Sequence, residues 1–311
     1  MSRYIAGLLA HVRPVFMLPV VATSICGALL APSVSASIAA QHAGAVATTL
    51  FVAHLRDGFV DGHVRGEETP PLSVAAYRWA TAIAVVVALA LTSSLVLTAG
   101  LLAASSVLAL LCLALLHAPY LDKHPVPVTV DYPLGIAITL CGGFAAQAGG
   151  LTAGVLAVAA GVAALLSGIK VGIDRLDAAF DATVGKRTVP VIASETGATW
   201  VAVGCFAAAA LVVLGAVSTG ILPRRAAIAL LPAAGCAVAT PAVAPRWAVR
   251  IQMGFSYAFV GVLFVALCNG RCHGWTILGR LLPASPVGQV QLYLVGRGPE
   301  LVEHFPFTAF L

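Results

Sequence analysis

Long apolar runs separated by short polar segments dominate this chain. Each run approaches the roughly 20 residues that an α-helix needs to cross a bilayer. Nine such runs lie at residues 15–31, 38–55, 78–97, 99–117, 133–149, 153–172, 199–220, 226–243 and 253–269. The pattern predicts an all-α, polytopic membrane protein with about nine transmembrane helices.

The composition supports this class and excludes a soluble globular protein. The 311 residues are 60% hydrophobic, with a mean hydropathy of +1.00. Only 9% are charged, against roughly a quarter in soluble domains. We expect one membrane domain over residues 1–270 and a poorly defined C-terminal tail at 271–311. No segment has the basic, aromatic-rich character of a nucleic-acid-binding surface.

Lys and Arg residues predict the orientation in the bilayer, because they concentrate on the cytoplasmic side. With the N-terminus in the cytoplasm, 12 of the 17 fall on or near the inner face. Small residues inside the runs predict close helix packing. Gly142 and Gly143 are one example, since no strand context suggests a phosphate-binding loop.

Acidic residues gather on the same predicted face, in two clusters. Asp57 and Asp61 follow the second run, and Asp174, Asp177 and Asp181 follow the sixth. At 100° per residue, each cluster lies on one face of a helix. Like charges at this spacing repel, so a bound cation would stabilise them. Oxygen-only ligands favour a hard ion such as Mg²⁺ or Ca²⁺.

A single cluster of this kind is more typical of a solvated loop, and we expect that role for Glu67 and Glu68. Two clusters favour a shared site. They follow runs that are four apart, and both contain the D-x-x-x-D spacing. Two four-helix repeats plus one further helix, arranged around a central cavity, would bring the clusters together.

These segments resemble the motifs of the UbiA superfamily of intramembrane prenyltransferases. The stretch DRLDAAFDATVGKRTVP at residues 174–190 is similar to the second family motif, D-x-x-D-x-x-x-D followed by G-x-K/R-T. Asp57 and Asp61 match the last two aspartates of the first motif, N-D-x-x-D-x-x-x-D. Arg13-Pro14 and the YLDK segment at residues 120–123 resemble two further landmarks. The resemblance covers about residues 10–270.

The resemblance implies a Mg²⁺-dependent transfer of an isoprenyl group from an isoprenyl diphosphate. The diphosphate would ionise to an allylic cation, which a lipophilic acceptor captures. The acceptor could be a quinone precursor, a glycerol-phosphate lipid or a polyene. The implied catalytic and metal-binding residues are Asp57, Asp61, Asp177 and Asp181, with Asp174 as a further metal ligand. The implied diphosphate-binding residues are Arg13, Lys123, Lys186 and Arg187, although anchoring at the inner face explains these cations equally well.

The chain departs from the family pattern at two places. Ala53 and His54 replace the Asn-Asp that opens the first motif, which removes an oxygen ligand. Pro70 replaces the Arg of an Arg-Pro-Leu element.

A second function class also accommodates paired acids, namely a multi-spanning transporter that uses them for ion coupling. Such a protein is expected to place ionisable residues or broken helices near the middle of the bilayer. Here the acids lie at the predicted membrane edge, which favours the enzyme.

Overall fold

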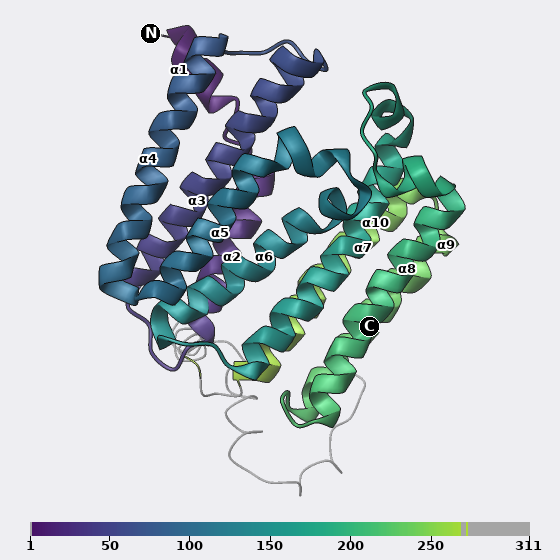
Figure 1. Cartoon of the computed structure of the whole chain (residues 1–311). Helices are drawn as coiled ribbons and strands as arrows, with labels where there is room; N and C mark the ends of the chain where they lie inside the picture. Colours follow the sequence, from purple (N-terminus) through teal and green to yellow (C-terminus); the bar gives the residue numbers. More distant parts are fainter. Residues whose placement is uncertain (1, 269–271, 273–311) are drawn as a thin grey trace, which may run out of the picture.

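The computed structural model describes residues 2–268 and residue 272, and these residues form helices and loops without any strand (Figure 1). The α-helices are α1 (Ser2–Leu9), α2 (Pro14–Leu30), α3 (Ala36–Phe59), α4 (Val74–Ala99), α5 (Leu101–Tyr120), α6 (Pro125–Ala148), α7 (Ala153–Thr183), α8 (Val189–Ser218), α9 (Leu230–Ala242) and α10 (Pro245–Cys268). A π-helix, η1 (Val60–Arg65), extends α3. The 3₁₀-helices η2 (Leu121–Lys123) and η3 (Arg224–Ala229) precede α6 and α9. The predicted tail at 271–311 lies outside the described residues, apart from Cys272.

The predicted all-α membrane fold is confirmed. Each of the nine apolar runs falls in a separate helix, from α2 to α10. Eight helical segments are long and apolar enough to cross a membrane, and α2 contributes the shorter apolar stretch Phe16–Leu30. The hydropathy pattern did not predict α1, because its 8 residues are too few to span a bilayer.

Length explains why the acidic clusters lie at one end of the bundle. The 31 residues of α7 correspond to about 46 Å at 1.5 Å per residue. This exceeds the roughly 30 Å of a hydrocarbon core. The last turns of α7, with their aspartates, therefore extend past the apolar zone. The π-helix η1 extends α3 in the same way.

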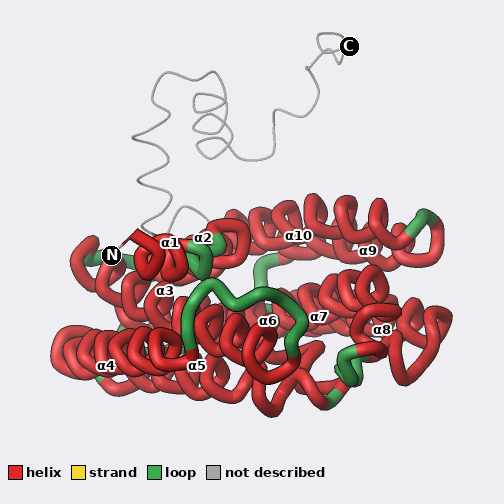
Figure 2. Tube along the Cα trace, turned by 90° about the horizontal axis from the view of Figure 1, so that it is seen from above, coloured by secondary structure: helices red, strands yellow, loops and turns green. Residues whose placement is uncertain are grey.

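The helices form two groups joined through α6 and α7. In the view from above, α6 and α7 lie between α2–α5 on one side and α8–α10 on the other (Figure 2). Extensive contacts between α2 and α6, α6 and α7, and α7 and α8 agree with this order. A Cβ atom on Gly27 would overlap the backbone of α6, and one on Gly143 would overlap the backbone of α2. The predicted close packing at Gly143 is thus confirmed.

Two helix boundaries depend on unusual backbone conformations. Gly100, with φ of 88°, separates α4 from α5 where the apolar pattern is nearly continuous. Ser194, with φ of 63°, kinks α8 after its first turn. The Ser194 hydroxyl then accepts a hydrogen bond from the Gly197 amide at 3.4 Å, which caps the remainder of α8.

Candidate active site

The two acidic clusters end in the same kind of turn. Gly66 (φ 69°) follows η1, and the Glu67 amide donates a hydrogen bond to the Asp61 carbonyl at 2.8 Å. Gly185 (φ 75°) follows α7, and the Lys186 amide donates to the Asp181 carbonyl at 2.9 Å. Glycine adopts this left-handed conformation without the cost of a Cβ clash.

The residues that follow the two glycines contact each other. The Lys186 ammonium donates to a Glu67 carboxylate oxygen at 2.9 Å, across 119 residues of sequence. Only 8% of the Glu67 side chain and 21% of the Lys186 side chain are exposed. The expectation that Glu67 belongs to a solvated loop is therefore wrong, whereas Glu68 is exposed as expected. The role of Glu67 could not be predicted from the sequence, because its partner lies in the other half of the chain.

Electrostatics keep Lys186 cationic. Burial alone would lower the pKa of Lys186, but its hydrogen bond to Glu67 and the nearby Asp61 carboxylate raise that pKa above its ordinary value. Lys186 thus lies within electrostatic reach of the first acidic cluster. It has the same relation to Asp181 in the second cluster. One cation therefore links the two clusters.

Arg65 is a second cation at this site, and it was not among the predicted site residues. Its guanidinium lies 3.3 Å from an Asp61 oxygen and 2.6 Å from an Asp122 oxygen. It also donates to the Ala118 carbonyl at 2.9 Å. These bonds fix the turn after α3 against the end of α5. In the YLDK landmark, the buried residue is Asp122, and Lys123 is exposed.

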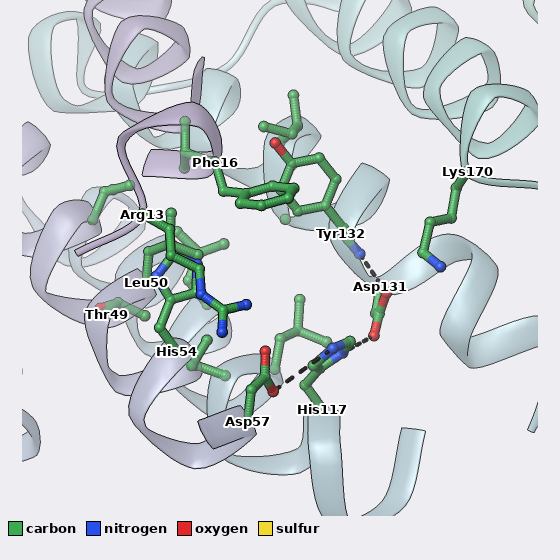
Figure 3. Close-up of a pocket in the computed structure, with 18 of the residues that line it drawn as sticks. Arg13, Phe16, Thr49, Leu50, His54, Asp57, His117, Asp131, Tyr132 and Lys170 are labelled. Atoms are coloured by element: carbon green, nitrogen blue, oxygen red, sulfur yellow. Dashed lines mark hydrogen bonds and ion pairs between the residues drawn. The ribbon is translucent and has the colours of Figure 1, made fainter. Parts of the chain in front are cut away.

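A cavity of about 300 Å³ opens between α2, α3, α5, α6 and α7 (Figure 3). Most of its wall is apolar, with Phe16, Val20, Val46, Leu50, Leu110, Leu113, Ile136 and Ile173. Polar and charged side chains gather at the end nearest the acidic clusters. They are Arg13, Asp57, His117, Asp131 and Lys170. We call this end the cavity mouth.

His117 connects two carboxylates at the cavity mouth. Its Nδ1 atom bonds to the buried Asp131, and its Nε2 atom lies 3.9 Å from an Asp57 oxygen (Figure 3). The Asp131 carboxylate also accepts the Tyr132 amide at 2.6 Å. Neither His117 nor Asp131 was a predicted site residue. A lone histidine near the end of an apolar run gives no signal until its partner, 14 residues away, is placed beside it.

The second acidic cluster is only partly turned inward. Asp174 is buried and forms an ion pair with Lys170. Asp181 is buried and accepts a hydrogen bond from the Thr188 hydroxyl at 3.2 Å. Asp177 is exposed, although it remains close enough to interact electrostatically with the other two aspartates.

The predicted diphosphate-binding cations divide in the same way. Arg13 immediately precedes α2 and lines the cavity beside Asp57 (Figure 3). Lys186 lies between the two clusters. Lys123 and Arg187 are exposed. Sequence position placed all four on one face of the membrane domain, but it could not distinguish inward from outward side chains.

The departures from the motif have structural counterparts. Ala53 lines the cavity one turn before Asp57. The His54 Nδ1 atom bonds to the His11 carbonyl at 3.0 Å, which ties α3 to the segment between α1 and α2. Pro70 packs against Gly62, where a Cβ atom would meet the proline ring.

Several buried carboxylate oxygens lack a hydrogen-bond partner and could accept a metal ion. They are one oxygen each of Asp57, Glu67, Asp122 and Asp174. Among the described residues, no three His, Cys, Asp or Glu side chains converge closely enough to hold a metal by themselves. This donor set fits Mg²⁺, which proteins commonly bind through one or two carboxylates together with substrate phosphates.

The fold and the cavity define a helical membrane protein with a polar-mouthed central pocket, and solved structures share this fold. Neither a family model nor a curated relative matches the sequence. A digeranylgeranylglyceryl phosphate synthase is 13% identical, with a TM-score of 0.69 over 87% of this chain and 99% of its own. A UbiA homologue from Aeropyrum pernix K1 is 19% identical, with a TM-score of 0.62 over 83% and 99%.

A third structure, a UbiA homologue from Archaeoglobus fulgidus bound to DMAPP and Mg²⁺, is 14% identical, with a TM-score of 0.65 over 85% of this chain and 99% of its own. The chain thus has the fold of the UbiA homologues, which confirms the fold that the motif resemblance implied.

Proposed function

We propose that this protein is an integral membrane prenyltransferase of the UbiA superfamily, which transfers an isoprenyl group from an isoprenyl diphosphate to a lipophilic acceptor. The main support for this proposal is the cavity, whose two ends differ in polarity. Its mouth gathers carboxylates and cations, while its depth is apolar. An isoprenyl diphosphate has the same division, with an anionic head and a hydrocarbon chain. The motif resemblance and the shared fold support the same reaction.

The cations of the mouth would bind the diphosphate head. Arg13 lies at the cavity wall, and Lys186 lies between the two acidic clusters. Both can stabilise the negative charge that builds up on the departing diphosphate as the bond from carbon C1 to oxygen breaks. On substrate binding, Lys186 would exchange its carboxylate partner Glu67 for a phosphate oxygen.

The carboxylates would hold Mg²⁺, with Asp57 and Asp61 on one side and Asp174, Asp177 and Asp181 on the other. Bound Mg²⁺ would neutralise phosphate charge and favour departure of the diphosphate. The unpartnered oxygens of Asp57 and Asp174 support these assignments.

The apolar wall would bind the isoprenyl chain and exclude water from the allylic cation. Burial of each CH₂ group contributes about 0.8 kcal/mol to binding. A nucleophilic atom of the acceptor would then form the new bond to C1 and release a proton. A quinone precursor, a glycerol-phosphate lipid and a polyene all fit this scheme.

The transporter alternative has less support from the described residues. Its ionisable groups would be expected near the middle of the bundle. Here the carboxylates of both clusters lie in the last turns of long helices, next to the glycine turns.

A transfer assay tests the function directly. Purified protein in lipid nanodiscs is supplied with Mg²⁺, a radiolabelled farnesyl or geranylgeranyl diphosphate and a lipid extract, and the labelled product is identified. We expect a new prenylated lipid that requires both Mg²⁺ and Asp61. Recovery of only the unreacted diphosphate, or of the same product with the Asp61→Asn variant, would contradict the proposal.

The proposal includes a cytoplasmic N-terminus and a cytoplasmic active site. Single cysteines placed near Glu67 and Thr183 should then react with a membrane-impermeant reagent from the cytoplasmic side. Cysteines near Ser35 and Gly150 should react from the opposite side. Labelling of the first pair from opposite sides would exclude a shared site.

A further inference from the structure

The deep end of the cavity is closed by a polar cluster inside an apolar bundle. His42 of α3 is fully buried. Its Nδ1 atom hydrogen-bonds with the Ser24 hydroxyl of α2 at 2.7 Å, and its Nε2 atom hydrogen-bonds with the Ser106 hydroxyl of α5 at 3.3 Å. We call these three residues, together with Gly142 of α6, the cavity floor.

The cavity floor lies one helical turn beyond the deepest cavity-lining residues. Val20, Val46 and Leu110 line the cavity. Ser24 is four residues after Val20, whereas His42 and Ser106 are four residues before Val46 and Leu110. Residues four apart lie above one another on a helix. The three helices therefore place the polar cluster directly beneath the apolar wall.

Helix packing leaves the cavity floor little freedom to move aside. A Cβ atom on Gly142 would overlap both the Ser106 hydroxyl and the His42 ring. Next to it, Gly143 packs against the backbone of α2 at Ser24. The α6 backbone therefore presses on the cluster from the fourth side. On these sides, close packing resists the insertion of further atoms.

The distance from mouth to floor sets how much chain can enter. Asp57 and Val46 are both cavity-lining residues of α3, and their separation of 11 residues corresponds to about 16 Å of helix. An isoprene unit advances a chain through four bonds of about 1.5 Å, or roughly 5 Å when extended. Measured from the cavity mouth at Asp57, with the diphosphate head bound outward toward Asp61 and Lys186, this length matches about three units.

From this geometry we propose that the cavity floor is a chain-length stop, which makes farnesyl diphosphate, with three isoprene units, the preferred donor over the four-unit geranylgeranyl diphosphate. This inference rests on the proposed function and specifies its donor. The floor is selective because of its polarity as well as its bulk. A hydrocarbon end that pushed between Ser24, His42 and Ser106 would leave buried polar atoms without partners.

A second cavity shows where a longer chain could go if the stop were removed. It has a volume of about 440 Å³, and Ser106 and Gly142 are among the residues that line it. Its other lining residues are mainly apolar and come from α5, α6 and α7. Removal of the His42 ring should connect the two cavities, because Ser106 belongs to the cavity floor and also lines the second cavity.

The test compares the affinities of geranyl, farnesyl and geranylgeranyl diphosphate for the full-length protein in nanodiscs with Mg²⁺, by competition against radiolabelled farnesyl diphosphate. For the natural protein we expect affinity to rise from two to three units, since more apolar surface is buried, and to fall at least tenfold from three to four. In His42→Ala, the affinity for the four-unit donor should increase at least tenfold. Thr48→Ala is the control, because its hydroxyl bonds only within α3 and it lines neither cavity, and it should leave all three affinities unchanged.

A second variant acts in the opposite direction and does not depend on His42→Ala folding. Val46→Phe fills the cavity just above the floor, and it should weaken farnesyl diphosphate binding at least tenfold while two-unit binding is retained. Equal affinity of the natural protein for three and four units, or unchanged chain preference in Val46→Phe, would overturn the length stop and leave the prenyltransferase proposal intact. Absence of Mg²⁺-dependent binding by all three diphosphates would instead overturn the proposed function.

Discussion

The C-terminal ends of α3 and α7 are built alike, yet they carry opposite charges at the position that follows the glycine turn. Both contain two aspartates four residues apart, and both end at a left-handed glycine. The next residue is Glu67 in the first half and Lys186 in the second. The two halves are therefore complementary rather than interchangeable, because each supplies the charge that the other half pairs with.

The two ends also differ in their supply of oxygen ligands. The second has three aspartates, at 174, 177 and 181, whereas the first has two, because His54 stands at the position that corresponds to Asp174. Cations lie at both ends, with Arg13 beside Asp57 and Arg65 beside Asp61 at the first, and Lys170 beside Asp174 at the second. The second half should therefore bind metal more tightly, because it has the additional carboxylate.

The largest effects are expected from single substitutions of the equivalent aspartate at either end. Asp61→Asn and Asp181→Asn change the last aspartate of each D-x-x-x-D pair and keep its size. Because each removes a charged ligand for Mg²⁺, we expect the rate of prenyl transfer to fall about 100-fold or more in either variant. Glu195→Gln is the control, since this acid is exposed and pairs only with Arg175. A rate near that of the natural protein in either aspartate variant would exclude that carboxylate from the site.

A smaller effect, on the KM for the diphosphate, should distinguish Lys186 from its neighbour Arg187. Lys186→Gln removes the cation that links both clusters, so the KM for the diphosphate should rise about 10- to 100-fold. Arg187→Gln should change KM less than twofold, because Arg187 is exposed. The pKa of Lys186 is raised above its ordinary value, so its contribution should persist across pH 6–9 and be lost only as pH rises through that pKa. Equal losses in the two variants would refute the inward role of Lys186.

An added oxygen ligand should strengthen metal binding at the first end. Ala53→Asn places an amide oxygen one turn before Asp57, on the cavity wall. We expect the Mg²⁺ concentration for half-maximal activity to fall about tenfold. The measurement is a Mg²⁺ titration of both proteins at saturating diphosphate. An unchanged or higher midpoint would indicate that another group already supplies this ligand.

The smallest effect concerns the contact between the ends. Glu67→Gln removes the charge that holds Lys186, and the partly buried bond is expected to contribute about 1 kcal/mol. The thermal midpoint of the detergent-solubilised protein should fall by about 2 °C. Glu68→Gln, one residue away and exposed, should leave it unchanged. A fall of the same size in both variants would mean that charge in the loop matters and that the contact does not.

The sequence predicted the fold because span length and hydropathy determine it in a bilayer. Apolar runs near 20 residues have no alternative to crossing as helices, since unpaired backbone groups are too costly in hydrocarbon. The acidic clusters were predicted because charged residues are rare in this chain, and like charges at this spacing repel unless a cation binds them. The close packing at Gly143 was predicted correctly, because small residues in membrane helices mainly allow neighbouring helices to approach.

The rest of the site could not be predicted. It depends on contacts between helices far apart in sequence, or on which of two adjacent residues faces inward. His117 and Asp131 meet only because α5 and α6 turn back on each other after η2. Asp122 points inward and Lys123 outward, although the two are adjacent in one 3₁₀ turn. Propensity and periodicity predict elements to within a few residues, and that precision is too low to decide which of two neighbours faces the cavity.

The contact between Glu67 and Lys186 also has a consequence for biosynthesis. The chain between them is 119 residues long, and ribosomes add about 5–20 residues per second, so roughly 6–24 s separate the synthesis of the two partners. During that interval the acids at the end of α3 are already at the membrane surface. Arg65 is synthesised with them and can neutralise Asp61 at once, because the two lie within one turn. The nascent first half therefore carries its own temporary counter-ion until α7 is inserted and Lys186 has been synthesised.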